Sequence, residues 1–340
     1  MTNIININDN PEILSDYKGL NLFDSNEWIK TLLHTFSYQI YAIQQDRGMI
    51  FFAFIDDFIG KRIVSLPFSD YVKSGLNIDQ LEDIIKTIER NFKDCPIKFR
   101  WDGESFKDCT IRNLTTNIVA QYHRVDIDDE DVMLKNTSNS FRRAVAKAKK
   151  NGVSIHKSSD IESVRRFFRL FAQHRKLKFK ILTPPITFFE VIFDEFFKAG
   201  NGFVLEAMLD GEVISAILLL KHKNVLYYKF GASKMEKLEY RSNNLLFWDL
   251  LCRARKDQYD IVDLGMSWCA DDDIGVVRFK QSMGAISYPI AIISNTLLAE
   301  DNKREDARQV LRDITKLIIE SDPDEELLHK AGNLLFRYFT

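Results

Sequence analysis

Three groups of residues in this 340-residue sequence have types and spacings that could carry out chemistry, and the first is a basic segment. Residues 135–180 contain eight lysines and six arginines but only two acidic residues, which gives the segment a net charge of +12. Such a surface would suit a polyanion such as a nucleoside diphosphate, coenzyme A, tRNA or an anionic lipid head group. A solvated helix face accounts for the same composition, and both interpretations stay open.

The second group is a possible phosphate site at the start of a helix, formed by Arg241, Ser242, Asn243 and Asn244. The first N–H groups of a helix lack partners within it and carry the positive end of its dipole, so they suit a pyrophosphate. An arginine just before them would add a bidentate phosphate contact. Ser242 or Asn243 acting only as a helix cap explains the same residues.

The third group consists of a lysine and a tyrosine. Lys280 stands near the end of a short expected helix before Gly284, where its charge could stabilise an oxyanion or a phosphate. Tyr227 and Tyr228 are neighbours on an expected strand, so their side chains lie on opposite faces, and Tyr228 could position a substrate. Alternatively, Lys280 is an ordinary surface charge, and Tyr228 has only a packing role.

The composition excludes several classes of protein. The net charge of -2 argues against a surface that is basic throughout, although the chain outside residues 135–180 carries -14. There is no CxxC or HxxxH spacing for zinc, and no nucleophile elbow, Walker loop or GxGxxG turn. We therefore expect no metal, no DNA partner, and no hydrolase, kinase or dehydrogenase.

The apolar runs at residues 49–55 and 213–220 are too short to span a membrane, and the first ten residues do not resemble a secretory signal. These features predict a cytoplasmic protein. Peripheral contact with a membrane surface remains compatible with them.

Hydrophobic periodicity predicts a similar order of elements in the two halves of the chain. In the first half we expect a helix capped by Ser25, a second helix at 78–92, and strands at 37–44, 49–55, 58–66, 97–101 and 117–126. In the second half we expect helices at 161–177, after Pro185, at 243–258 and before Gly284, and strands at 202–209, 212–221, 224–232, 260–264 and 285–293.

These elements suggest an N-terminal domain at 1–135, a linking basic helix at 136–152, a C-terminal domain at 153–295 and a helical tail at 296–340. In the tail, Asp322, Pro323 and Glu325 are expected as the cap, the first-turn proline and the capping-box acid of a helix.

The order of these elements, together with several motifs, resembles the FemAB-like branch of the GNAT acyltransferase superfamily. The similarity covers roughly residues 24–293. The matching stretches are residues 65–71 (SLPFSDY), 141–148 (FRRAVAKA) with Asn151 to Val153, 205–215 with its Asp-Gly turn, 227–233, 241–248, and Phe279 and Lys280 with Gly284.

The resemblance implies an α+β fold of two tandem GNAT-like domains, each a mixed, mostly antiparallel twisted sheet flanked by helices, with a cleft between them. It implies transfer of an acyl or aminoacyl group to an amine of a cell-envelope precursor or sugar, such as a peptidoglycan or polysaccharide precursor. The donor would be an aminoacyl-tRNA or an acyl-CoA, so the expected partners are a phosphate-bearing donor, a nucleotide-linked precursor, and tRNA.

The family motifs also suggest roles for individual residues. Lys280 would stabilise the oxyanion, and Asp70 would orient or deprotonate the incoming amine. Arg175 would contact a phosphate, and Tyr228 would hold the acceptor. GNAT enzymes bind the pyrophosphate of coenzyme A with a glycine-rich loop at the position of Arg241 to Asn244, where this chain has Ser242 and Asn244 instead of glycines.

Two other functions stay open at this point. One is a coenzyme A dependent N-acetyltransferase that acts on a small amine. The other is a non-catalytic GNAT-fold protein that uses the basic segment to bind an anionic partner.

Overall fold

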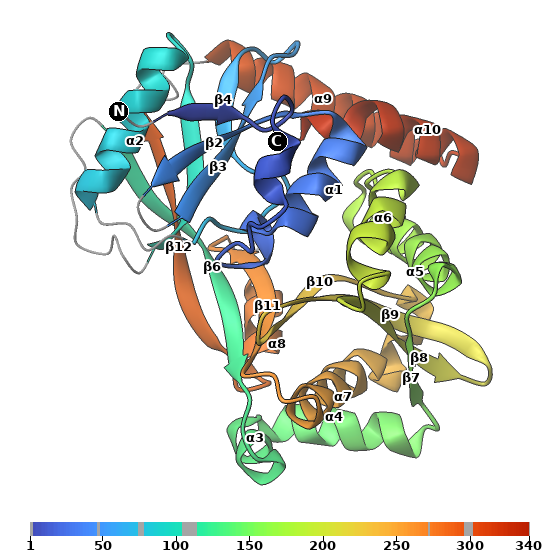
Figure 1. Ribbon diagram of the computed structural model, residues 1–340. Coiled ribbons are helices and arrows are strands. Elements are labelled where there is room, and N and C mark those ends of the chain that lie inside the picture. Colours follow the sequence, from blue (N-terminus) through green and yellow to red (C-terminus); the bar gives the residue numbers. More distant parts are fainter. Residues whose placement is uncertain are drawn as a thin grey trace. The chain divides into compact units, whose positions relative to one another are not determined.

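The computed structural model describes residues 3–45, 48–73, 78–103, 114–270, 273–295 and 302–339 (Figure 1). The chain forms two compact units. Unit 1 comprises Met1–Gln121, Tyr288–Ile314 and Arg337–Thr340, and unit 2 comprises Tyr122–Ser287 and Thr315–Phe336. The fold is α+β with mixed, mostly antiparallel strands, which confirms the expected fold class.

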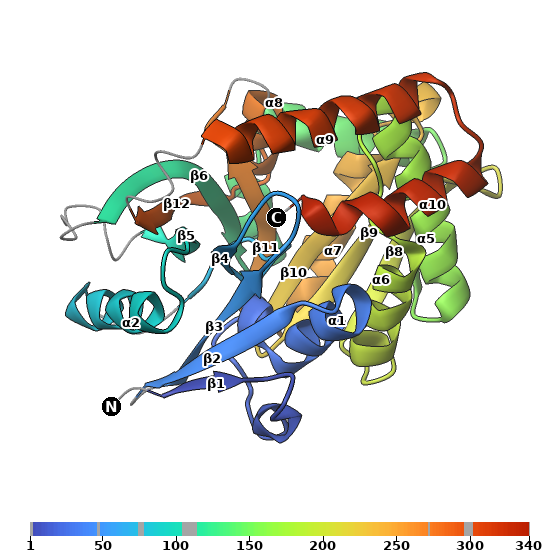
Figure 2. The same ribbon diagram turned by 90° about the horizontal axis from the view of Figure 1, so that it is seen from above.

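Unit 1 contains strands in the order β1-β2-β3-β4-β5-β12, of which only β4 and β5 are parallel neighbours. Figure 2 shows β1, β2 and β3 side by side. These strands are β1 (Ile4–Asn6), β2 (Gln39–Gln45), β3 (Gly48–Ile55), β4 (Arg62–Ser65), β5 (Ile97–Asp102) and β12 (Ile286–Asn295). The helices of this unit are α1 (Asn26–Phe36), α2 (Ile78–Asn91) and the first part of α9 (Asn302–Glu320).

Unit 2 contains strands in the order β6-β11-β10-β9-β8-β7. The pairs from β7 to β10 are antiparallel, and β10 and β11 are parallel. The strands are β6 (Leu114–Asp126), which begins in unit 1, β7 (Ser154–Ser158), β8 (Gly202–Leu209), β9 (Glu212–His222), β10 (Val225–Ser233) and β11 (Ile261–Trp268).

Helices cover both faces of the unit 2 sheet (Figure 1). On one face lie α4 (Asn139–Lys150) and α7 (Ser242–Lys256), and on the other lie α5 (Ile161–His174) and α6 (Ile186–Ile192). The amphipathic pattern of α4 explains its place, since Phe141, Val145 and Ala148 form one buried stripe and most of its lysines are exposed. The remaining helices are α3 (Glu130–Asn136), α8 (Ile274–Gln281) and α10 (Glu325–Leu335).

A cluster of phenylalanines joins α5 and α6 to β10 and accounts for part of the unusual phenylalanine content. The Phe189 ring lies at its centre, 5.4 Å from the Phe168 ring, 5.7 Å from the Phe171 ring and 5.2 Å from the Phe230 ring. Because aromatic rings bury large apolar areas and attract one another edge to face, this cluster fixes α5 and α6 on the sheet.

Most of the expected elements are present, and the differences have local causes. The strand expected at 58–66 is only Arg62–Ser65, because Asp57 accepts hydrogen bonds from the Ile59 amide (2.9 Å) and the Arg62 guanidinium (2.8 and 3.0 Å) and so holds a turn. The prediction that Asp322 caps the last long helix is wrong. Asp324 caps α10 by accepting from the Leu327 amide.

Other elements extend beyond the predicted ones. The helix expected at 161–177 is α5 followed by a π-helical turn, Arg175–Phe179, and β11 runs to Trp268 rather than to residue 264. The short elements β1, β7 and α3 are among those that were not expected.

Replacing Phe189 by alanine should destabilise unit 2 by about 3–5 kcal/mol, because the side chain is fully buried and its loss leaves a cavity. Urea unfolding followed by circular dichroism measures the change. Phe179→Ala is the matched control, since that ring is 49% exposed and its loss should have little effect. Equal stability of the two variants would contradict the central place of Phe189.

Candidate functional site

Two parallel strands of unit 2 part from one another, and this opening is the candidate site. Strands β10 and β11 pair at three positions, from Val225 opposite Ile261 to Tyr227 opposite Asp263, although they continue to Ser233 and Trp268. On its other side, β10 shifts register against β9 between Tyr228 and Phe230. A bulge of this kind bends a strand, so β10 turns away beyond Tyr227.

Lys280, on α8, binds the part of β11 that β10 no longer reaches. Its side chain is buried, and the ammonium donates hydrogen bonds to the Gly265 oxygen (2.9 Å), the Met266 oxygen (2.9 Å) and the Ser267 hydroxyl (3.0 Å). A buried lysine charge is costly unless hydrogen bonds compensate for its lost hydration. The predicted catalytic lysine therefore lies at the β11 wall of the opening.

His123, on β6, is a buried neighbour of Lys280 that sequence reasoning missed. Burial, with a smaller effect from the Lys280 charge, lowers the pKa of His123 to about 3. Its Nδ1 lies 3.1 Å from the Ser287 hydroxyl. The imidazole is therefore neutral at physiological pH and does not add a second positive charge beside the lysine.

Tyr228 lies on β10 beside the opening. Its ring packs edge to face on Phe247 of α7, with 4.9 Å between the ring centroids, and its hydroxyl lies so close to Gly231 that a Cβ there would collide with it. Burial raises the pKa of Tyr228 to about 12. The hydroxyl therefore stays protonated, and it can donate a hydrogen bond but cannot serve as a base near neutral pH.

The start of α7 is tied to the end of β10. Arg241 precedes the helix in a left-handed conformation (φ 58°) with an exposed side chain, and its carbonyl accepts from the Asn244 amide at 3.1 Å. The Ser233 hydroxyl donates to Asn243 Oδ1 at 2.9 Å. The helix terminus that was predicted to bind phosphate is therefore held against the strand that lines the opening.

His174, at the end of α5, binds the same strand end. Its Nδ1 lies 2.7 Å from the Ser233 carbonyl oxygen, and burial lowers its pKa, so a neutral ring with Nδ1 as donor fits this contact. Sequence reasoning missed His174 and the contact between Ser233 and Asn243, although it placed Asn243 at the start of the helix. The short loop from Ser233 to Asn243 was the signal that could have indicated this contact.

Arg175 makes local contacts. Its Nε and Nη2 donate to the Leu182 carbonyl oxygen at 2.8 and 2.6 Å, and its guanidinium lies over the rings of Phe171 (5.4 Å) and Phe336 (5.9 Å). Burial lowers its pKa to about 10. In this structure Arg175 closes the turn after α5, and its predicted phosphate contact stays a prediction.

Asp70 lies in unit 1, whereas the other five predicted residues lie in unit 2. It is half-buried, and its charge opposes the lowering of the pKa of Arg100 by burial. The Arg100 guanidinium also donates to the Ser69 oxygen at 3.0 Å. The roles predicted for Asp70 and Tyr228 stay predictions as well.

Some side chains of the basic segment are neutralised by acidic partners. Arg166 forms two hydrogen bonds to the buried Glu206 (2.9 and 3.0 Å), and Lys176 pairs with Asp322 at 2.5 Å. Arg165 pairs with two glutamates. The lysines of α4, by contrast, are exposed to solvent.

The comparisons with known proteins agree with this geometry. Residues 135–281, which include the opening, α7 and Lys280, match the family model of the acetyltransferase (GNAT) domain. This segment is therefore similar to GNAT acetyltransferase domains. No curated protein matches the sequence of the chain.

Solved structures with the same fold support the wider resemblance. A structure of FemX aligns with a TM-score of 0.64 at 15% identity and covers 86% of this chain and 96% of that one. The structure of L-PGS from Bacillus licheniformis aligns with a TM-score of 0.55 at 11% identity and covers 85% of this chain and 91% of that one. A tandem GNAT protein from the clavulanic acid biosynthesis pathway aligns with a TM-score of 0.50 at 10% identity and covers 87% of this chain and 98% of that one. The chain therefore has the fold of FemX and of tandem GNAT proteins.

No helix among the described residues combines the length and hydropathy that a membrane span needs. No group of three or more His, Cys, Asp or Glu residues in the same ranges is arranged to hold a metal ion.

The buried histidines predict an acid dependence of stability. The pKa of His123 is about 3 in the folded state and roughly 6.5 in the unfolded chain, so between these values the unfolded chain binds more protons. The contribution of neutral His123 to the free energy of unfolding is fully present above pH ~6.5. It should fall by up to about 1.4 kcal/mol per pH unit as the pH drops towards 3.

Urea unfolding between pH 7 and pH 4 measures this slope, which should be shallower in His123→Gln. His34→Gln, an exposed position on α1, is the control and should keep the wild-type slope. The same slope in both variants would show that His123 does not contribute.

Proposed function

We propose that this chain is an acyltransferase that transfers an acyl or aminoacyl group to an amine of a cell-envelope precursor or sugar. The opening between β10 and β11 carries the proposal, because it lies in the segment that matches the acetyltransferase domain and has Lys280 at one wall. The α7 terminus is held at its β10 end through Ser233 and Asn243.

The reaction is the attack of an amine on an ester or thioester carbonyl. A C–N bond forms and negative charge develops on the carbonyl oxygen. The C–O or C–S bond to the donor then breaks, and one proton of the amine passes to the departing oxygen or sulfur, which leaves as an alcohol or thiol. A fixed cation in a water-poor site stabilises that oxygen strongly. Lys280 supplies this charge, and its contacts to β11 keep the ammonium in place.

The donor binds along the opening with its phosphates at the start of α7. The dipole of this 15-residue helix and the exposed Arg241 guanidinium both favour a phosphate there, and Asn244 lies in the first turn. The left-handed conformation of Arg241 makes the bend without a glycine.

The nature of the donor and acceptor is inferred from the structural neighbours. FemX and L-PGS share the fold, and a further neighbour is titled a putative lysylphosphatidylglycerol synthetase. These names support an aminoacyl-tRNA donor and a cell-envelope precursor as acceptor, in the cytoplasm. In this scheme Asp70 orients the amine, Tyr228 donates a hydrogen bond to the acceptor, and Arg175 assists with phosphate.

A second candidate is a coenzyme A dependent N-acetyltransferase of a small amine, which the acetyltransferase family model favours. Calorimetric titration with acetyl-CoA separates the two. Binding of acetyl-CoA that weakens in Arg241→Ala supports this second function, and binding of an aminoacyl-tRNA alone supports the first.

Removing the cation should abolish most of the transfer. Lys280→Met should lower kcat by about 10²–10³-fold, the usual effect of removing one oxyanion-stabilising group. The measurement is single-turnover transfer from the donor that binds, with the thermal transition recorded to confirm folding. Arg278→Ala, an exposed position on the same helix, is the control. Transfer at the wild-type rate by folded Lys280→Met would rule out this role.

Removing the exposed arginine tests the phosphate contact without disturbing the core. Arg241→Ala should weaken donor binding about 10- to 100-fold, because a hydrogen bond to a charged group contributes roughly 1.5–3 kcal/mol. Lys256→Ala makes the same charge change at the opposite end of α7 and should leave affinity unchanged. Equal losses in both variants would indicate general electrostatic attraction rather than a site.

A further inference from the structure

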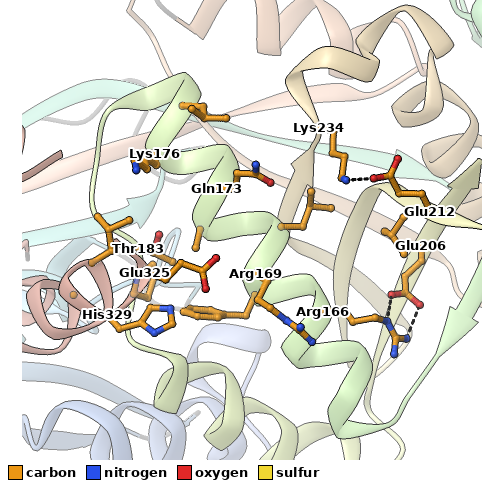
Figure 3. Close-up of a pocket in the computed structure, with 18 of the residues that line it drawn as sticks. Arg166, Arg169, Gln173, Lys176, Thr183, Glu206, Glu212, Lys234, Glu325 and His329 are labelled. Atoms are coloured by element: carbon orange, nitrogen blue, oxygen red, sulfur yellow. Dashed lines mark hydrogen bonds and ion pairs between the residues drawn. The ribbon is translucent and has the colours of Figure 1, made fainter. Parts of the chain in front are cut away.

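Unit 2 contains a cavity of about 860 Å³ that is separate from the opening, and none of the six predicted site residues lines it. It lies between α5, the β8–β9 turn and α10 (Figure 3). Its volume falls within the range of pockets that bind small organic ligands.

The charges around this cavity are balanced. Three of the basic residues that line it already have acidic partners: Arg166 pairs with Glu206, Lys234 with Glu212, and Lys176 with Asp322. A phosphate site needs an excess of positive charge, and these pairs remove it. The cavity therefore does not suit the polyanion that residues 135–180 suggested.

Two opposite charges remain, one on each of two facing elements. Arg169 of α5 has only a long contact from its Nε to the Arg165 oxygen (3.4 Å) and no acidic partner within the described ranges. Glu325, in the first turn of α10, has no basic partner among the same residues. Figure 3 shows both side chains at the cavity, with the carboxylate of Glu325 turned inward.

The rest of the lining is mostly apolar and comes mainly from α5 and the turn after it, from β8 and β9, and from α10. The Phe168 ring lies 5.2 Å from the His329 ring and joins α5 to α10. Further apolar residues of the lining include Leu170, Ala172, Leu177, Met208, Val213 and Leu328. A ligand held by Arg169 and Glu325 would therefore bury an apolar middle portion.

We propose that this cavity binds a short peptide that carries both a carboxylate, held by Arg169, and a free amine, held by Glu325. One unpaired cation and one unpaired anion above an apolar floor are complementary to a zwitterion. A ligand with only one of these charges would leave the opposite charge of the cavity desolvated and unpaired. This inference goes beyond the proposed transfer and does not depend on it.

The cavity also borders the end of β10. Lys234, which lines it, follows Ser233 directly, and Gln173 precedes His174, which binds the Ser233 carbonyl oxygen. A peptide bound there would lie beside the strand end that also forms one edge of the opening.

Direct binding tests the proposal without any assay of transfer. The probe is a mixed tripeptide library with Ala, Leu, Phe, Glu or Lys at each position, and retention by the full-length protein is read by ultrafiltration and mass spectrometry. Parallel libraries with acetylated N-termini or amidated C-termini each lack one charge. Peptides with both free termini should be retained, and the two blocked libraries should bind at least about tenfold more weakly.

Variants locate the site. Arg169→Gln and Glu325→Gln are exposed substitutions that should each reduce retention of the free tripeptides at least about tenfold. The matched controls are Arg143→Gln on α4 and Glu326→Gln, the next residue of α10, and both should bind like the wild type.

Three results would overturn the proposal. One is that the wild type retains no tripeptide, and another is that the Arg169 and Glu325 variants retain them as well as their controls do. The third is that inorganic pyrophosphate binds and is lost in Arg169→Gln while the peptides do not bind, which would make the cavity an anion site.

Discussion

The hydrogen bonds of the Lys280 ammonium to β11 are the contacts on which the opening depends. A strand that loses its neighbour leaves backbone groups that must find other partners. Beyond Asp263, β11 no longer pairs with β10, and Lys280 donates to the Gly265 and Met266 carbonyl oxygens there. The same lysine therefore satisfies carbonyl oxygens of β11 beyond its pairing with β10 and places a positive charge beside this part of the strand. Lys280 thus has both a structural role and a proposed chemical role.

The end of β10 is held in a similar way by side chains from both layers of helices. His174 reaches Ser233 from α5, and Asn243 reaches it from α7. The phenylalanine cluster fixes α5 on the sheet, so the position of His174 follows from apolar packing rather than from local polar contacts. The proposed phosphate site at α7 and the cavity beside α5 thus meet at one strand end.

The sequence predicted the elements well where hydrophobic periodicity was strong, as in α1, α5 and β8. It missed β7 and α3, which are short and largely polar. The separation of β10 and β11 could not be predicted, because it depends on pairing between residues more than 30 positions apart. The partners of part of the basic segment could not be predicted for a related reason: Glu206 and Asp322, which pair with Arg166 and Lys176, lie far along the chain. The motif that pointed to Lys280 carried no information on its acceptors in β11.

Hydrogen exchange of the backbone amides in the wild type and in Lys280→Met tests the central claim most directly, because it reads the state of β11 residue by residue. If Lys280 holds β11 beyond its last pair with β10, amides from Gly265 to Trp268 should exchange at least about tenfold faster in the variant, since each lost hydrogen bond contributes about 1–3 kcal/mol. Amides of the segment from Ile261 to Asp263, which pairs with β10, should keep their wild-type exchange rates. Unchanged exchange throughout β11 would contradict the account.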